Sequence, residues 1–109
     1  MKIAIIGSRR INSIDISKYI PDDADMIISG GAMGVDTLAE QYADEHGIEK
    51  LIIHPDYELY GKSATLIRDK IIVDHADMVV AIWDGLSSGT AFTINYAKHR
   101  EVPCKIYIV

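Results

Sequence analysis

The sequence predicts an α/β fold, in which helices cover both faces of a doubly wound parallel sheet of about five strands. Apolar runs of strand length recur along the chain. They are continuous rather than alternating, as in strands that are buried on both faces. About 12–20 residues separate successive runs, which is enough for a crossover helix and its loops. This regular alternation is typical of right-handed βαβ units that share one sheet.

The expected strands are the apolar runs at residues 3–6, 26–28, 51–53, 78–82 and 105–109. Helical apolar spacing fills the intervals, with helices expected from Asn12 or Ser13 to Ile20, from Asp36 to Gly47, from Lys62 to His75 and from Thr90 to His99. No linker or internal repeat divides the chain, so residues 1–109 are expected to form a single domain. The order of the strands within the sheet stays open at this stage.

Composition narrows the class of protein. Of the 109 residues, 49% are hydrophobic and 25% are charged, which is the profile of a globular domain and excludes disorder. The net charge of −5 disfavours a protein that coats nucleic acid, and leaves only a local basic patch for that purpose. No apolar stretch approaches the roughly 20 residues of a membrane helix. The N-terminus lacks signal-peptide features, so a cytoplasmic protein is expected.

The cysteine, histidine and serine residues show no pattern of a disulfide, a metal site or a catalytic triad. Cys104 stands alone beside an apolar run, and it is expected to be a small buried side chain rather than half of a disulfide. The histidines show no ligand spacing with it, so neither a metal site nor a metal cofactor is expected. No nucleophile-elbow pattern for Ser-His-Asp chemistry is present.

The glycine-rich segment at residues 29–36 is the most informative motif. It reads Ser-Gly-Gly-Ala-Met-Gly-Val-Asp and joins an expected strand to an expected helix. Free N–H groups at such a helix start attract anions, above all phosphate, and glycine lets a ligand approach the backbone. Asp36 either caps its helix or holds a ribose or a partner side chain. The segment matches neither the Walker loop nor the dinucleotide fingerprint, and a simple turn is the alternative.

Further loops are expected at the same edge of the sheet, where the parallel strands end. Ligands of such sheets bind beyond these carboxyl ends. Residues 85–90 repeat the pattern of glycine, hydroxyl side chain and helix start. Ser8 and Arg9 end the first strand, and Arg68 and Lys62 could reach toward a phosphate from the third helix. Aromatic side chains near this edge could stack on a base or pack in the core: Tyr57, Tyr60 and Trp83.

These segments together resemble the SLOG superfamily, and most closely its small stand-alone branch of YspA- and cpYpsA-related proteins. The resemblance is carried, in order, by residues 7–9, 29–36, 61–64, 68–69 and 85–90. The chain is more distantly similar to the Rossmann domain of DNA-processing protein A and to the LOG ("lysine decarboxylase-like") phosphoribohydrolases. The resemblance implies a Rossmann-like sheet and a pocket for a nucleotide or a nucleotide-derived ligand.

Motif and resemblance together define the candidate ligand-binding residues: Gly7, Ser8, Arg9, Ser29, Gly30, Gly31, Gly34, Asp36, Lys62, Arg68, Gly85, Ser87, Ser88, Gly89 and Thr90. Two positions depart from the families' patterns. Asp69 replaces the asparagine of an Arg-Asn pair, and Thr93 stands where the phosphoribohydrolases carry a glutamate. Cleavage of an N-glycosidic bond needs a group that stabilises or protonates the developing charges, so this departure argues against that activity.

Three functions follow as hypotheses. The favoured one is binding of a nucleotide or an ADP-ribose-like ligand by a sensing or processing domain. The alternative is a nucleotide hydrolase, for which Arg68, Asp84 and Asp36 are the weak catalytic candidates. The third is binding of single-stranded nucleic acid through Arg9, Arg10, Lys62 and Arg68. A homodimer or higher homo-oligomer is expected by analogy with the family.

Overall fold

The computed structural model, which describes residues 1–109, contains a single five-stranded sheet in the order β3-β2-β1-β4-β5. The strands are β1 (Lys2–Gly7), β2 (Met26–Ser29), β3 (Glu49–Ile52), β4 (Met78–Trp83) and β5 (Cys104–Ile108). All neighbouring strands run parallel. The chain therefore builds outward from β1 to β3, crosses back over the sheet, and adds β4 and β5 on the other side of β1. This Rossmann-like order confirms the expected fold class.

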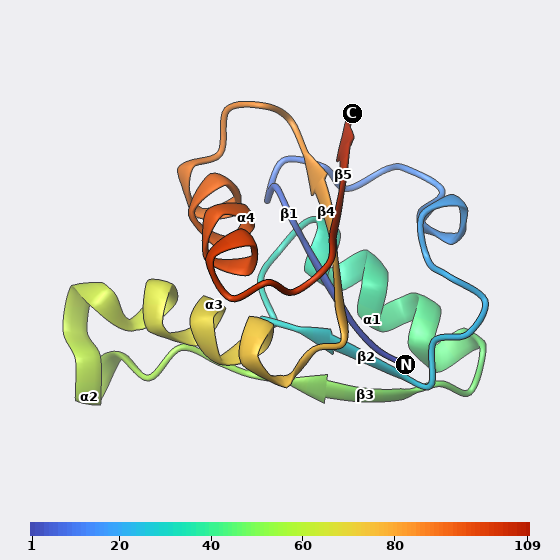
Figure 1. Ribbon diagram of the computed structural model, residues 1–109. Coiled ribbons are helices and arrows are strands. Elements are labelled where there is room, and N and C mark those ends of the chain that lie inside the picture. The colour runs from blue at the N-terminus through green and yellow to red at the C-terminus, as the bar shows by residue number, and fades with distance from the viewer.

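Helices cover both faces of the sheet, as expected. The α-helices are α1 (Val35–Glu45), α2 (Tyr57–Tyr60), α3 (Ala64–His75) and α4 (Ser88–His99), and the 3-10 helices are η1 (Ile16–Lys18) and η2 (Gly61–Ser63). Figure 1 shows α1 on one side of the strands and α3 and α4 on the other. Right-handed crossovers require this arrangement, because the connections on the two sides of β1 run in opposite directions. None of the helices has the length and apolar character needed to cross a bilayer.

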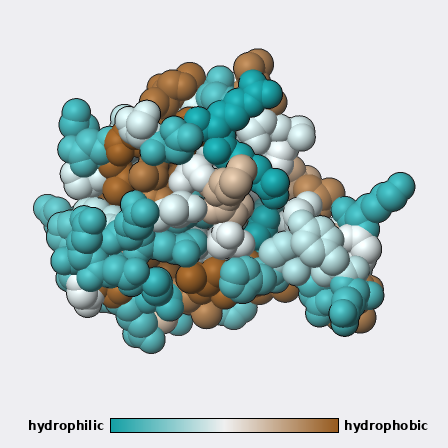
Figure 2. Space-filling model, turned by 180° about the vertical axis from the view of Figure 1, so that it is seen from behind, coloured by the Kyte–Doolittle hydropathy of each residue, from teal (hydrophilic) through white to brown (hydrophobic).

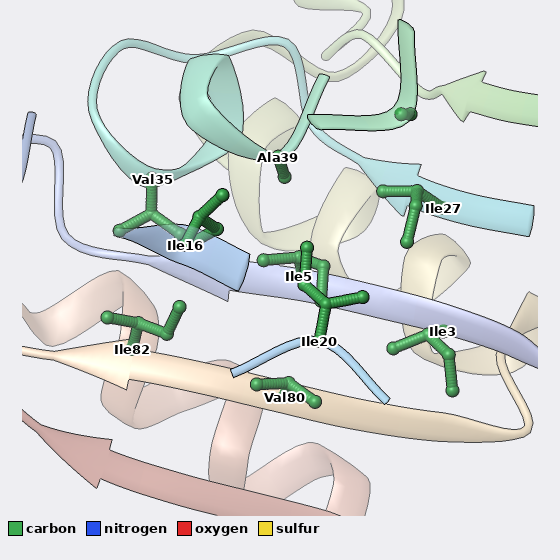
Figure 3. Packing of buried hydrophobic residues seen from close by; sticks show 10 residues of the cluster. Ile3, Ile5, Ile16, Ile20, Ile27, Val35, Ala39, Val80 and Ile82 are labelled. Atoms are coloured by element: carbon green, nitrogen blue, oxygen red, sulfur yellow. The ribbon is translucent and has the colours of Figure 1, made fainter. Parts of the chain in front are cut away.

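Two apolar clusters hold these layers together. On one face, Val35 and Ala39 of α1 pack against β1, β2 and β4, and the buried strand side chains point toward them (Figure 3). On the opposite face, Ile72 of α3 and Ile94 of α4 pack on Ala4 and Ala81. Strand residues alternate between the two clusters, which explains why the apolar runs in the sequence are continuous.

The segment between β1 and β2 differs from the prediction. Instead of a helix from Asn12 or Ser13 to Ile20, it forms only the short η1, which Asp15 caps by accepting the Ser17 amide at 3.2 Å. Such local side-chain bonds compete with a continuous helix. Ile16 and Ile20 still reach the core, at 7% and 5% exposure, so the apolar spacing reflects two core anchors rather than helical turns.

The other boundaries shift in ways that matter for the site. The helix expected from Thr90 begins at Ser88 with Ser87 as its cap, and the helix expected from Lys62 begins at Ala64, after η2. The unpredicted α2 is capped by Asp56, which accepts the Leu59 amide at 3.1 Å.

The apolar surface also differs in part from expectation. Cys104 on edge strand β5 is only half-buried, contrary to expectation, because nothing pairs with the outer edge of this strand. Half of the exposed large apolar side chains lie on α2 and β5, namely Tyr57, Leu59, Tyr60, Ile106 and Ile108, and the two most exposed are Leu86 and Met33. In the view of Figure 2, hydrophobic residues form separate patches among hydrophilic ones.

Candidate functional site

A cleft of about 440 Å³ opens at the carboxyl ends of β1 and β4. These neighbouring strands are connected in opposite directions across the sheet, which makes this edge the topological switch point where ligands of such folds bind. Four segments line the cleft, and they contribute Ile6, Gly7, Ser8, Arg9 and Arg10; Ala32 and Asp36; Thr65, Arg68, Asp69 and Ile72; and Asp84, Leu86, Ser87, Ser88, Gly89, Thr90 and Thr93. Its volume lies in the range of small-molecule sites.

The loop after β1 forms one wall of the cleft and is tied to its neighbours through Ser8. The hydroxyl of Ser8 accepts the Asp84 amide at 3.1 Å, and the Ser8 carbonyl accepts the amides of Ile11 and Val35. Ser8 is 1% exposed, whereas Arg9 and Arg10 are exposed on the rim. Ser8 therefore connects the ends of β1 and β4, and the two arginines supply exposed cations.

The glycine-rich segment 29–36 uses its glycines to accommodate protein atoms. A Cβ on Gly30 would meet the guanidinium of Arg68, and one on Gly34 would lie 2.5 Å from the Arg9 carbonyl oxygen. Asp36 accepts the amides of Gly30 and Ala32 at 3.2 and 3.1 Å. Two N–H groups that an anion could have bound are thus already bonded to Asp36, and only Ala32 and Asp36 of this segment line the cleft.

Arg68, Asp36 and Asp69 form a buried charged cluster at the inner end of the cleft. Arg68 is 7% exposed; its Nε donates to Asp69 Oδ1 at 2.7 Å, and its Nη1 donates to the carbonyl of Gly30. Burial raises the pKa of Asp36 to about 6, although the amides of Ala32 and Gly30 and the charge of Arg68 oppose that rise. Burial also raises the pKa of Asp69, against the opposing effects of Arg68 and Thr93.

The start of α4 forms the outer wall of the cleft. Ser87 caps the helix by accepting the Thr90 amide at 3.4 Å, and Asp84 accepts the amides of Leu86 and Ser87 at 2.8 and 2.9 Å. These bonds to the Asp84 carboxylate hold its pKa below the usual range. The amides of Ser88 and Gly89 have no acceptor within the chain. A helix start with free amides is suited to an anion.

The structure brings part of the predicted set together. The predicted residues that line the cleft are Gly7, Ser8, Arg9, Asp36, Arg68, Ser87, Ser88, Gly89 and Thr90, together with the weak catalytic candidate Asp84. The predicted residues outside its lining are Ser29, Gly30, Gly31, Gly34, Lys62 and Gly85. Ser29 donates instead to Glu40 Oε2 at 2.8 Å, and Gly31 packs against His54.

Several lining residues are absent from the predicted set. Thr65, Asp69 and Ile72 share one face of α3 with Arg68, so helical periodicity around Arg68 could have found them. Thr93 lies one turn after Gly89 and donates its hydroxyl to the Gly89 carbonyl at 2.9 Å. Arg10 is named only for the nucleic-acid hypothesis, because an exposed arginine in a turn is ordinary and does not by itself indicate a ligand site.

The raised pKa of Asp36 predicts a pH-dependent stability. The carboxyl group of Asp36 holds its proton more tightly in the folded protein than in the unfolded chain, where its pKa is 3.8. Its contribution to stability is therefore complete below about pH 4 and is lost as the pH rises toward 6. Asparagine can accept the same amides without a charge. We expect Asp36→Asn to raise the free energy of unfolding at pH 7.5 by about 2 kcal/mol.

Urea denaturation at pH 7.5 and pH 4 measures this effect, and the gain should be near zero at the lower pH. A variant that is less stable than the wild type at pH 7.5 would contradict the prediction, because it would mean that Arg68 makes the ionised carboxylate stabilising.

Fold and cleft together define the class: an α/β protein of Rossmann-like architecture whose candidate site lies at the switch point of its sheet. A solved structure of DNA processing protein A from Helicobacter pylori is similar, with a TM-score of 0.74 and 22% sequence identity over 97% of this chain. This chain spans 64% of that chain. The neighbour's structure is described as revealing a unique single-stranded DNA binding mode.

At this identity the likeness establishes the fold. It agrees with the distant resemblance to DNA-processing protein A, whereas assignment to the SLOG superfamily stays a prediction. No protein-family model matches the chain, and no curated protein matches it in sequence.

Proposed function

We propose that this protein binds a nucleotide or a nucleotide-derived ligand in the cleft between β1 and β4, with the ligand's phosphate at the start of α4. The observation that carries the proposal is the pair of Ser88 and Gly89 amides, which have no protein acceptor and belong to residues that line the cleft. Arg9 and Arg10 stand on the same rim and add positive charge. Backbone amides and arginines are the donors that phosphate prefers.

Binding rather than cleavage is the function proposed. Thr93 occupies the position at which the resemblance to the phosphoribohydrolases places a glutamate, and it is 2% exposed with its hydroxyl bonded to the Gly89 carbonyl. The position therefore offers no acid. The alternative of a hydrolase rests on Arg68, Asp84 and Asp36, which line the cleft but are bonded to the chain's own amides, carbonyl and carboxylate groups.

The role of the α4 amides is tested by Ser88→Pro. Proline fits the first residue of a helix and removes its N–H, and the extended conformation of Ser87 (φ −60°, ψ 120°) suits the position before proline. Losing one hydrogen bond to a charged phosphate weakens binding by about tenfold or more. We expect this loss for the tightest-binding of AMP, GMP, CMP and UMP in isothermal titration calorimetry.

Ser88→Ala is the matched control, because it removes the hydroxyl and keeps the amide. We expect it to lose less affinity than Ser88→Pro, since it keeps the amide that binds the phosphate and removes a hydroxyl that makes no hydrogen bond within the chain. Equal affinities of the proline and alanine variants would place the phosphate elsewhere, and wild-type protein that binds none of the four nucleotides would refute the proposal.

Single-stranded DNA binding is the second candidate, and the described binding mode of the structural neighbour favours it. The positions of the basic side chains in this protein disfavour DNA binding. Arg68 is buried and bonded to Asp69, and Lys62 lies outside the cleft lining, so Arg9 and Arg10 alone of the expected patch are exposed at the cleft. An oligothymidylate in the same titrations, at two salt concentrations, tests it; affinity above that of every nucleotide, falling steeply with salt, would favour DNA.

A further inference from the structure

The inner end of the cleft carries a different chemistry from its outer wall. Besides the Asp84 carboxylate, which accepts the amides of Leu86 and Ser87, the outer wall and rim offer donors: the amides of Ser88 and Gly89 and the guanidinium groups of Arg9 and Arg10. At the inner end, the buried Arg68 stands with two carboxylates, Asp36 and Asp69. A phosphate suits the first set, but the two carboxylates would repel it from the second.

Two members of this inner cluster, Asp36 and Arg68, each keep a polar atom for a ligand. Asp36 bonds the loop amides through Oδ2 alone, and Arg68 uses Nε and Nη1, which leaves Asp36 Oδ1 and Arg68 Nη2 without a partner in the chain. No buried side-chain nitrogen or oxygen lacks a hydrogen-bond partner, so these two atoms reach solvent. Because Asp36 and Arg68 are 8% and 7% exposed and both line the cleft, that solvent is in the cleft.

A hydroxyl group satisfies such a mixed set, because it donates to a carboxylate and accepts from a guanidinium at once. The position is also suitable for a sugar. Asp69 lies against Thr93, and Thr93 bonds to the Gly89 carbonyl one helical turn earlier, so the inner cluster adjoins the first turn of α4, which carries the free amides. A phosphate and the vicinal hydroxyls of the ribose that carries it are separated by only a few covalent bonds.

We propose that Asp36, Arg68 and Asp69 bind the vicinal hydroxyls of a ribose, so that the cleft selects ribonucleotides over 2′-deoxyribonucleotides. The proposal rests on nucleotide binding at the cleft. Selection follows because a deoxy ligand displaces water from the charged groups without replacing its hydrogen bonds, and sites built to bond a hydroxyl reject ligands that lack it. A single-stranded DNA ligand would be disfavoured for the same reason.

The test compares AMP, GMP, CMP and UMP with their 2′-deoxy counterparts, dAMP, dGMP, dCMP and dUMP, by isothermal titration calorimetry on the wild-type protein. We expect the tightest-binding ribonucleotide to bind at least fivefold more tightly than its deoxy counterpart. A ratio below fivefold overturns the selection while leaving nucleotide binding intact. If no nucleotide of either series binds, the proposed function itself fails, and this proposal fails with it.

Asp69→Asn assigns the selection to the inner cluster. The amide oxygen of asparagine can still accept from Arg68 Nε, but the atom beside it becomes an uncharged donor. We expect the ribo-to-deoxy ratio to fall at least threefold, with affinity for the deoxy nucleotide unchanged or tighter, because a negative charge near the phosphate is gone. A merely structural role would weaken both ligands equally and leave the ratio unchanged, which overturns the proposal.

Asp74→Asn is the matched control on the same helix, because Asp74 lies outside the cleft lining and bonds the Tyr96 hydroxyl. We expect the ribo-to-deoxy affinity ratio of this variant to equal that of the wild type. A fall in this ratio like that of Asp69→Asn would overturn the assignment of the selection to the inner cluster. Asp36→Asn, which keeps an acceptor for the Gly30 and Ala32 amides, serves as a second inner-cluster variant should Asp69→Asn fail to fold. The same fall in ratio is expected for it, and an unchanged ratio contradicts the proposal.

Discussion

Gly34→Ala is expected to destabilise the protein by about 4 kcal/mol or more, a loss that few single substitutions reach. Gly34 has φ +78° and ψ −127°, a backbone conformation almost confined to glycine, which costs another residue about 1–3 kcal/mol. Its Cβ would also lie 2.5 Å from the Arg9 carbonyl oxygen and 2.6 Å from that of Ser8. Both contacts are with backbone, so neither can be relieved by a change of rotamer, and the loop after β1 must move.

Gly47→Ala separates the two effects. Gly47 has φ +64° but nothing lies within 4 Å of the position its Cβ would take, so this variant carries the backbone strain without the clash. We expect it to lose about 1–2 kcal/mol. Urea denaturation of both variants gives the comparison. Equal losses would show that the loop after β1 yields freely, which contradicts the close approach of the two loops.

Arg68→Met is expected to cost about 3–5 kcal/mol, the penalty for breaking a buried ion pair by removing one partner. The Gly30 carbonyl and the Asp69 carboxylate each lose their donor, and Asp36 loses a nearby positive charge. Since the charge of Arg68 lowers the pKa of both carboxyl groups, removing it raises both further. The loss of stability should therefore be larger at pH 7.5 than at pH 5.

Two further variants make this result interpretable. Lys62→Met removes an exposed cation outside the cleft lining, and its stability should stay within about 0.5 kcal/mol of the wild type. The double variant Arg68→Met with Asp69→Leu removes both charges of the pair, and it should recover part of the loss. A double variant that is less stable than Arg68→Met would argue against an unpaired Asp69 as the source of the destabilisation.

The fold class could be predicted because buried parallel strands leave a strong signal. The five apolar runs agree with the strands to within two residues at either end, and every interval long enough for a full helix contains one except the first. The helix predicted in that first interval is wrong because Ile16 and Ile20 have the apolar spacing of a helix, whereas Asp15 and Ser17 form a local hydrogen bond instead. Apolar spacing reports burial, and burial does not require a helix.

The candidate site could be predicted only in part. Residues next to the end of a strand, such as Ser8 and Asp84, could be predicted from the sequence because parallel strands end at one edge. The roles of the glycines could not be predicted. Gly30 and Gly34 look in the sequence like positions for ligand approach, but Arg68 and the loop after β1 occupy the space beside them. Those neighbours are remote in sequence, and local pattern carries no information about them.

The amino-acid sequence alone predicts the parallel α/β sheet, the edge of that sheet where loops with donors and acceptors gather, and the two helix starts suited to an anion. Hydrophobic periodicity and glycine placement are local properties, so they can be read along the chain. The tertiary structure determines which donors of these two segments are already bonded: Asp36 accepts the amides of Gly30 and Ala32 in the loop before α1, whereas the amides of Ser88 and Gly89 in α4 have no acceptor in the chain. It also decided that Asp69 lies beside Arg68 within the cleft, because hydrogen bonds and burial depend on which remote segments meet.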